Sequence, residues 1–203
     1  MILALLLACR PIPGGDDYSS QEDLSWLTDD EVLMGADPWE PGEPRLTVGL
    51  FYEGGASHAV PIDNLKVFYY VYEGTYFQDD SDDRVEGEHA DRIIHAGGGW
   101  FGGGIHFEDG PRDFSVWSTL HVSMKSSAAS MEALQLGTTT VDGEFSTPLT
   151  EWGFASDGAW HTIEIDMASV ATGIEATSVP LSFIGGAGTT GDALLVDDLY
   201  WTP

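Results

Sequence analysis

Residues 159–166 read AWHTIEID, and this stretch has the period of a β-strand. Successive side chains on a strand point to opposite faces of the sheet. Ile163 and Ile165 therefore share one face with Ala159 and His161. The other face carries one tryptophan and three polar residues: Trp160, Thr162, Glu164 and Asp166. A solvated outer face is the favoured interpretation of this polar side, and a groove that binds hydroxyl groups is the alternative.

Short apolar runs of the same kind follow one another from Leu46 to the end of the chain. Turn signals such as Gly54-Gly55, Asp142-Gly143 and Asp157-Gly158 separate them. We expect strands near residues 46–52, 66–73, 88–95, 100–107, 118–125, 131–137, 159–166, 179–184 and 193–201. A short helical turn is expected within residues 166–178. This pattern predicts an all-β domain, an antiparallel β-sandwich of the jelly-roll type.

The composition limits the classes of ligand. The chain has 34 acidic and 7 basic residues among 203, a formal net charge of −27. We therefore do not expect the protein to bind nucleic acid or anionic lipid through a basic patch. Such acidity suits divalent cations, a high-salt environment or neutral ligands. The chain has a single cysteine, so no disulfide framework is expected, and we expect a monomer.

The single cysteine, Cys9, closes a short apolar run and precedes a segment rich in proline, glycine and acids. This arrangement resembles the lipobox of bacterial lipoproteins, although no Lys or Arg precedes the apolar run. The resemblance implies a signal peptide over residues 1–8, a lipidated Cys9 with a disordered acidic tether over residues 9–45, and a domain over residues 46–203. It also implies an envelope protein held by a lipid anchor alone, with the outer membrane favoured because Arg10, not Asp, follows the cysteine. A cysteine buried in a short N-terminal strand or helix is the alternative.

Several motifs occur in a recognisable order in residues 66–201. They are Glu86-Gly87, the strand around Trp100, Asp113-x-Ser115, Asp157-Gly158-x-Trp160 and Val196-Asp197-Asp198-Leu199. This order resembles the galactose-binding-like β-jelly rolls that serve as carbohydrate-binding modules. The resemblance implies a protein that binds poly- or oligosaccharide without cleaving it. It also implies one structural Ca²⁺, held by Asp197 together with Glu86 or Glu53; calcium takes six to eight oxygen ligands.

Aromatic side chains are the expected ligand contacts, because flat rings stack on the C–H faces of sugars while polar groups bind the hydroxyls. Glycines surround two of the candidates, and polar residues lie beside the others. The candidates are Tyr76, Trp100, Phe101, Trp117 and Trp152. Burial in the core is the alternative for each tryptophan, and it is the favoured placement for Trp160 and Trp201.

A catalytic alternative rests on Glu164 and Asp166. The run Glu164-Ile165-Asp166 resembles the active-site strand of laminarinases, in which a further glutamate acts as acid/base. Retaining glycosidases need two carboxyl groups about 5–5.5 Å apart, but here Ala168 and Ser169 stand where that glutamate would be. We therefore expect no catalytic residues. A glycan hydrolase or lyase and an envelope domain that binds another protein remain the alternatives.

Metal chemistry has little other support in the sequence. The acidic run 79–83 lacks the glycine and the terminal glutamate of an EF-hand loop, and a solvated hairpin loop is its favoured interpretation. The six histidines show no zinc-binding spacing.

Overall fold

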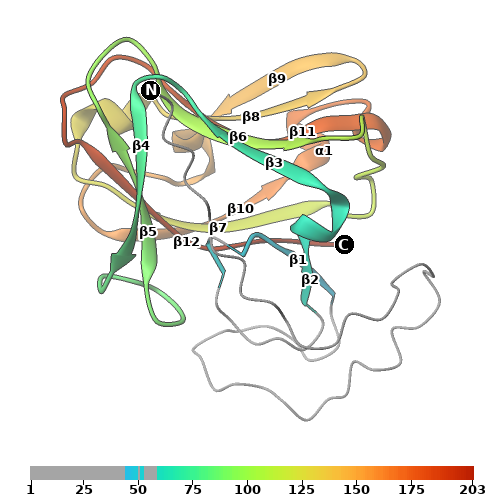
Figure 1. The fold of residues 1–203 in the computed structure, drawn as a ribbon, viewed down its shortest axis with the longest axis horizontal. Coiled ribbons are helices and arrows are strands. Elements are labelled where there is room, and N and C mark those ends of the chain that lie inside the picture. Colours follow the sequence, from blue (N-terminus) through green and yellow to red (C-terminus); the bar gives the residue numbers. More distant parts are fainter. Residues whose placement is uncertain (1–43, 50, 53–58) are drawn as a thin grey trace, which may run out of the picture.

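A computed structural model describes residues 44–49, 51–52 and 59–203. Two β-sheets pack face to face in this part of the chain (Figure 1). Sheet A contains β10 (Trp160–Asp166), β7 (Thr119–Lys125), β12 (Ala193–Thr202), β1 (Arg45–Thr47), β2 (Ala59–Pro61), β5 (Ala90–His95) and β4 (Thr75–Ser81). Sheet B has the order β3 (Val67–Val71), β6 (Phe101–Phe107), β11 (Thr177–Gly185), β8 (Gln135–Thr140) and β9 (Gly143–Pro148). The predicted β-sandwich of jelly-roll type is confirmed.

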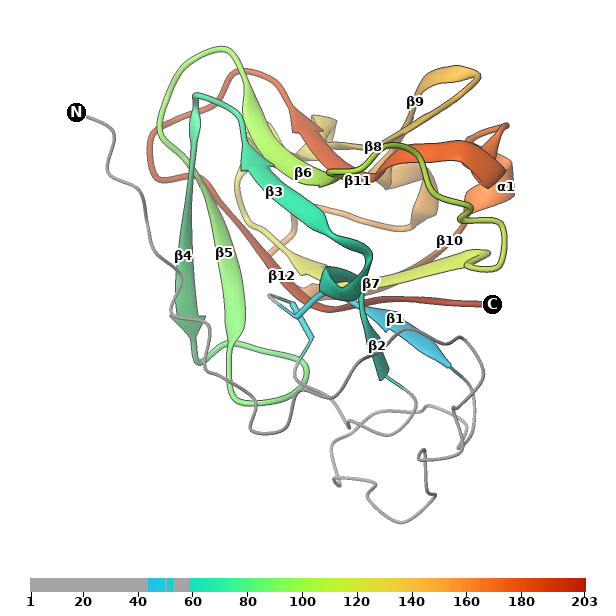
Figure 2. The same ribbon diagram turned by 45° about the vertical axis from the view of Figure 1, so that its right-hand side comes forward.

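The last strand, β12, organises sheet A. It pairs with β7 along one side, while β5 and then β1 share its other side. A bulge between Asp197 and Tyr200 interrupts the pairing with β7, and Asp198 has a φ of 51° there. At the far end of sheet A, β4 and β5 form a steep pair at the left of the view, where the chain passes from β3 of sheet B into sheet A (Figure 2).

Short helices close the connections. They are η1 (Ile62–Leu65), η2 (Ala129–Ala133), η3 (Leu149–Trp152), α1 (Met167–Val170) and η4 (Ile174–Ala176). Asp166 caps α1, because its Oδ1 accepts a hydrogen bond from Ala168 N at 3.0 Å and its Oδ2 accepts one from Ser169 Oγ at 2.7 Å. The helical turn expected within residues 166–178 is thus confirmed. No helix of the described residues is long and apolar enough to cross a membrane.

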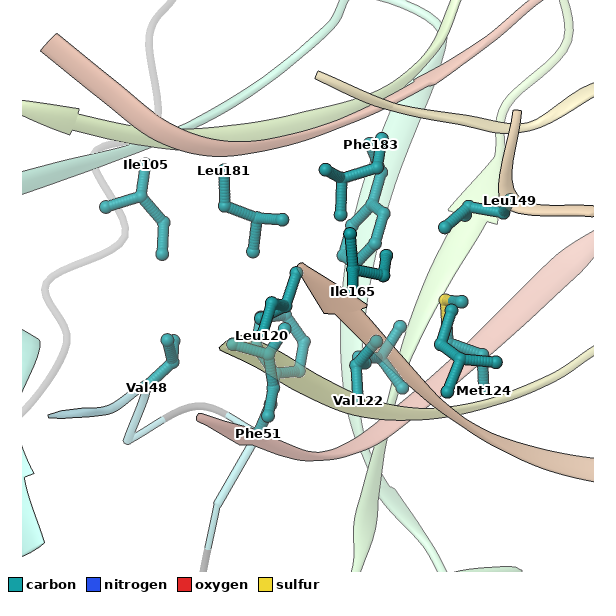
Figure 3. Close-up of a cluster of buried hydrophobic side chains, with 14 of the residues drawn as sticks. Val48, Phe51, Ile105, Leu120, Val122, Met124, Leu149, Ile165, Leu181 and Phe183 are labelled. Carbon is teal, nitrogen blue, oxygen red and sulfur yellow. The ribbon is translucent and has the colours of Figure 1, made fainter. Parts of the chain in front are cut away.

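The core fills the space between the sheets (Figure 3). Leu120, Val122 and Ile165 from sheet A face Leu181 and Phe183 from sheet B, and all five side chains are buried. Burying one such side chain contributes roughly 1.5–3 kcal/mol, so the strand alternation is strongly specified.

Each strand expected from the sequence overlaps an observed one, but β2, β4 and β9 were not expected. Their sequences give only a weak strand pattern, because β2 has three residues, β4 ends in two acids and a serine, and β9 consists mainly of glycine and polar residues.

Two tryptophans expected in the core have different outcomes. Trp201 is fully buried and its ring meets Phe114 edge-on, which confirms the prediction. Trp160 is half-buried on the outer face of sheet A, where its indole N–H donates to Asp83 Oδ1 at 2.9 Å. The core placement of Trp160 is therefore wrong, because the neighbouring Ile163 and Ile165 take the inward positions of β10.

Candidate functional site

The outer face of sheet B carries a line of aromatic side chains that begins on β3. Val67 and Tyr69 pack against the core, so alternation places Phe68 and Tyr70 on the outer face. Phe68 is 56% exposed, and Tyr70 and Tyr72 are half-buried. At about 3.3 Å per residue, Phe68 and Tyr72 are about 13 Å apart along the strand. We call Phe68, Tyr70, Tyr72 and the adjoining outward positions of sheet B the aromatic face.

Glycines on β6 give the tyrosines room. Tyr70 pairs with Gly104 and Phe68 with His106, while Tyr72 N donates to Gly102 O at 2.9 Å. A Cβ built on Gly104 would lie 2.8 Å from Tyr70 Oη. The absence of a side chain at Gly104 therefore lets the phenol lie across the sheet.

A row of small residues continues from Tyr70 across the other strands. Gly104 pairs with Ser182, Ser182 with Gly137, and Gly137 with Ser146. We call these four residues the small-residue row. At about 4.8 Å between neighbouring strands, the five strands span about 19 Å from Tyr70 to Ser146.

Bulkier residues flank the small-residue row on both sides. On one side the bulkier residues are Ile184, Gln135 and Pro148, which pair with one another across β11, β8 and β9. Gly102 of β6 pairs with Ile184. On the other side the outward positions include His106 on β6 and Glu144 on β9, both exposed. A Cβ built on Gly137 would lie 2.6 Å from Ile184 Cδ1, so the side chain of Ile184 packs over this part of the small-residue row.

The electrostatics of the aromatic face favour neutral polar groups. Burial raises the pKa of Tyr70 to about 12; Tyr72 and then Glu144 act in the same direction, whereas a hydrogen bond with Ser182 opposes the shift. The rings of Tyr70 and Tyr72 meet edge-on at 5.9 Å. The Tyr70 phenol therefore stays protonated at neutral pH. The five strands of sheet B contain no lysine or arginine.

The structure does not gather the five predicted ligand residues. Trp100 is 66% exposed directly before β6, and Tyr76 is 46% exposed on β4 of sheet A. Trp117 and Trp152 are half-buried against the core, and Trp152 Nε1 donates to Thr147 Oγ1 at 3.1 Å.

The structure contradicts the prediction that Phe101 contacts a ligand. Its side chain is 1% exposed and its ring stacks on His95 at 5.3 Å. Phe101 opens β6 and lies on the same face as Ile105 and Phe107, which are also buried. Phe101 takes the inward position and belongs to the core.

Sequence reasoning missed Phe68, Tyr70 and Tyr72 as site residues. A signal was present, because aromatic residues occupy alternate positions in the run KVFYYVYE of residues 66–73. Gly102 and Gly104 repeat the same two-residue period on β6. The pairing of these two segments, which the register shows, is needed to combine the two signals.

Glu164 and Asp166, the residues of the catalytic alternative, have separate environments. Both lie on the outward face of β10, as alternation predicted. Asp166 is engaged in capping α1. Glu164 is 72% exposed, with its Oε1 at 3.6 Å from His121 Nδ1. The two carboxyl groups thus have different partners, one at the start of a helix and the other beside an imidazole.

Asp197, the predicted calcium ligand, is buried and receives backbone N–H groups. Its Oδ2 accepts from Val85 N at 2.7 Å and from Glu86 N at 3.1 Å, and its Oδ1 accepts from Asp198 N at 2.9 Å. Within the described ranges, no three His, Cys, Asp or Glu side chains gather closely enough to hold a metal ion. These residues alone do not make a calcium site. Glu53 and Cys9 lie outside the described residues, so calcium and lipidation stay predictions.

The comparisons with known proteins support the fold. No family model matches the chain, and no curated protein does. The family 30 carbohydrate-binding module of the cellulosomal cellulase Cel9D-Cel44B of Clostridium thermocellum is 12% identical, with a TM-score of 0.52 over 67% of this chain and 90% of that one.

Two further solved structures are more distant by TM-score. The family 11 module from Clostridium thermocellum, in complex with a β-1,3-1,4-mixed-linked tetrasaccharide, is 17% identical, with a TM-score of 0.46 over 68% of this chain and 88% of that one. A β-1,2-glucanase from Parabacteroides distasonis is 14% identical, with a TM-score of 0.45 over 66% of this chain and 22% of that one. At these identities the likeness extends to the fold alone.

Proposed function

We propose that this chain is a non-catalytic carbohydrate-binding lipoprotein of a bacterial envelope, and that its ligand lies on the aromatic face of sheet B. The observation that carries the proposal is the line of rings from Phe68 through Tyr70 to Tyr72 beside the small-residue row. Trp100, which is 66% exposed, directly precedes β6, the strand that pairs with β3, and is included in the proposed site.

The chemistry of the aromatic face matches that of a sugar. A pyranose ring offers C–H faces that stack on aromatic rings, and hydroxyl groups that need directional partners. Rings from β3 supply the first kind of contact. Half-buried or exposed polar side chains at outward positions supply the second: Gln135, Ser146 and Glu144. A length of about 13 Å between the outer rings suits a short oligosaccharide segment better than a single sugar.

Charge narrows the ligand class to neutral glycans. The strands of sheet B contribute Glu144 but no lysine or arginine, and the whole chain carries a net charge of −27. Like charges repel within a Debye length of about 8 Å at physiological salt. A polysaccharide of uronate or sulfate groups would meet that repulsion without a lysine or arginine from these five strands to compensate it.

Binding to soluble polysaccharides tests the proposal. The full chain carrying Cys9→Ser is titrated by calorimetry with a soluble β-1,3-1,4-glucan and with other neutral and uronate polysaccharides. We expect binding to at least one neutral glycan. Since stacking on one ring contributes about 0.5–1.5 kcal/mol beyond the area buried, Phe68→Ala and Trp100→Ala should each weaken binding about threefold or more.

Tyr76→Ala is the matched control, because it removes an exposed ring from sheet A. An affinity that falls in Tyr76→Ala and stays constant in Phe68→Ala would move the site to the other sheet. If no neutral glycan binds, the proposal fails. Conversion of a glycan by the wild type that is lost in Glu164→Gln would favour the hydrolase or lyase instead.

The lipoprotein part of the proposal rests on the sequence around Cys9. The acidic, proline-rich residues 9–45 would then serve as the spacer between the membrane and the carbohydrate-binding domain. With Arg10 after the cysteine, the outer membrane is the proposed location.

A further inference from the structure

His95 ends β5 with a buried imidazole whose two nitrogens have different partners. Its side chain is 1% exposed, and its ring lies parallel to Phe101, with an interplanar angle of 6°. Nδ1 accepts a hydrogen bond from Gly97 N at 2.9 Å, and Nε2 lies 3.1 Å from Gly186 O. Since a backbone N–H only donates and a carbonyl only accepts, these partners assign the neutral tautomer with the proton on Nε2.

Through these bonds His95 joins two connections at one end of the sandwich. The first, residues 96–100, leads to Trp100; the second is residues 186–192. Thr190 Oγ1 also donates to Ala96 O at 3.1 Å, and Gly98 forms an isolated bridge with Gly188. A Cβ built on Gly188 would lie 2.6 Å from His95 Cδ2, so the second connection packs directly against the imidazole.

We infer that His95 is a positioning residue for Trp100, and that protonation of His95 weakens glycan binding on the aromatic face. This inference rests on the proposed function. A proton on Nδ1 would face the N–H of Gly97, so two donors would meet and their hydrogen bond would be lost. The imidazolium would also be a charge in a buried place, which is costly without a partner.

The groups around the imidazole identify where that charge would be compensated. β4 contributes Thr75 and β6 contributes Phe101, neither of which is charged. Asp192 ends the second connection, and its pKa is lowered first by the hydrogen bond from Ser130, then by the N–H of Thr189, and also by the charge that His95 carries when it is protonated. Asp192 is therefore a carboxylate that can stabilise the imidazolium.

The pH dependence of binding tests the inference. The full chain with Cys9→Ser and His106→Gln, which removes the exposed histidine of the aromatic face, is titrated with a soluble β-1,3-1,4-glucan, or with the neutral glycan found to bind. We expect affinity about fivefold to tenfold lower near pH 5 than near pH 7.5, the size of one hydrogen bond's contribution.

His95→Asn in the same background is the matched variant. Its amide oxygen offers Gly97 an acceptor that does not titrate, so the ratio of affinities between the two pH values should approach one. An affinity that does not change with pH in the parent, or one that changes equally in both proteins, overturns the inference.

A measurement without ligand separates this inference from the proposed function. Nitrogen NMR of the imidazole should show the Nε2–H tautomer near pH 7.5, and the Gly97 amide should exchange faster on acidification. The Nδ1–H tautomer, or a Gly97 amide whose exchange follows only the intrinsic pH dependence, overturns the role of His95 even if glycan binds. If no glycan binds while both NMR results appear, the proposed function fails and the pH-dependent release of residues 96–100 stands.

Discussion

Replacing Asp197 by alanine should destabilise the domain by about 2–4 kcal/mol. The carboxylate is 1% exposed and accepts hydrogen bonds from the backbone of a connection more than a hundred residues away in the sequence, at Val85 N and Glu86 N. Glu86 is buried, so its N–H would lose this acceptor in a place that water reaches poorly, at a cost of about 1–3 kcal/mol. Val85 is 38% exposed, so water can replace its partner at a smaller cost.

The assay is thermal unfolding of the full chain with Cys9→Ser, followed by circular dichroism. For a domain of this size 1 kcal/mol shifts the melting temperature by about 2–4 °C, so a destabilisation of about 2–4 kcal/mol should lower it by roughly 4–16 °C. Asp197→Asn keeps an acceptor oxygen but loses the charge, and its loss should be smaller. Asp82→Ala is the control: it removes an exposed acid from the same connection and should be nearly neutral.

Hydrogen exchange identifies the mechanism. The Glu86 amide should be protected in the wild type and exposed in Asp197→Ala. If Asp197→Ala melts with the wild type, the backbone donors do not depend on this carboxylate and the reasoning is refuted.

Other properties of the chain can be tested independently. Folding raises the pKa of Tyr69 and Tyr70, that of Tyr70 to about 12, so the folded protein holds these protons more tightly than the unfolded chain. Stability should therefore fall as pH rises above about 10; absorbance titration should show two late tyrosines, one of which is lost in Tyr70→Phe. If calcium binds Asp197, a chelator should lower the melting temperature by several degrees in the wild type but hardly in Asp197→Ala. A melting temperature that does not change with chelator would mean that backbone N–H groups, not calcium, compensate the charge of Asp197. Cys9→Ser should abolish lipid labelling, whereas unchanged membrane fractionation would contradict the lipobox.

The function proposed here depends on a face that no single segment creates. Tyr70, Gly104, Ser182, Gly137 and Ser146 lie in one row across sheet B. Strand pairing brings together segments that are far apart in the sequence. The same holds at His95, which joins residues 96–100 to residues 186–192.

Local sequence was sufficient for most of the sandwich. The two-residue period marks which side of a strand is apolar, and for β7, β10 and β12 that side is the buried one. The order of motifs from Glu86 to Asp197 predicted a jelly roll, and the structure has that architecture. Period-two patterning is a property of each strand by itself, and for this reason it could be read from the chain.

The site was decided by the tertiary structure. Alternation assigns a side chain to one side of its own strand, but strand order and register determine which residues it meets there. Phe101 and Tyr70 show the difference. The glycines beside Phe101 suggested that its ring is exposed, yet the ring packs in the core. The role of Tyr70 could be recognised only from the pairing of β3 with the glycines of β6. The physical reason is that these pairings are non-local, and their energy comes from packing two sheets together, which no segment achieves alone.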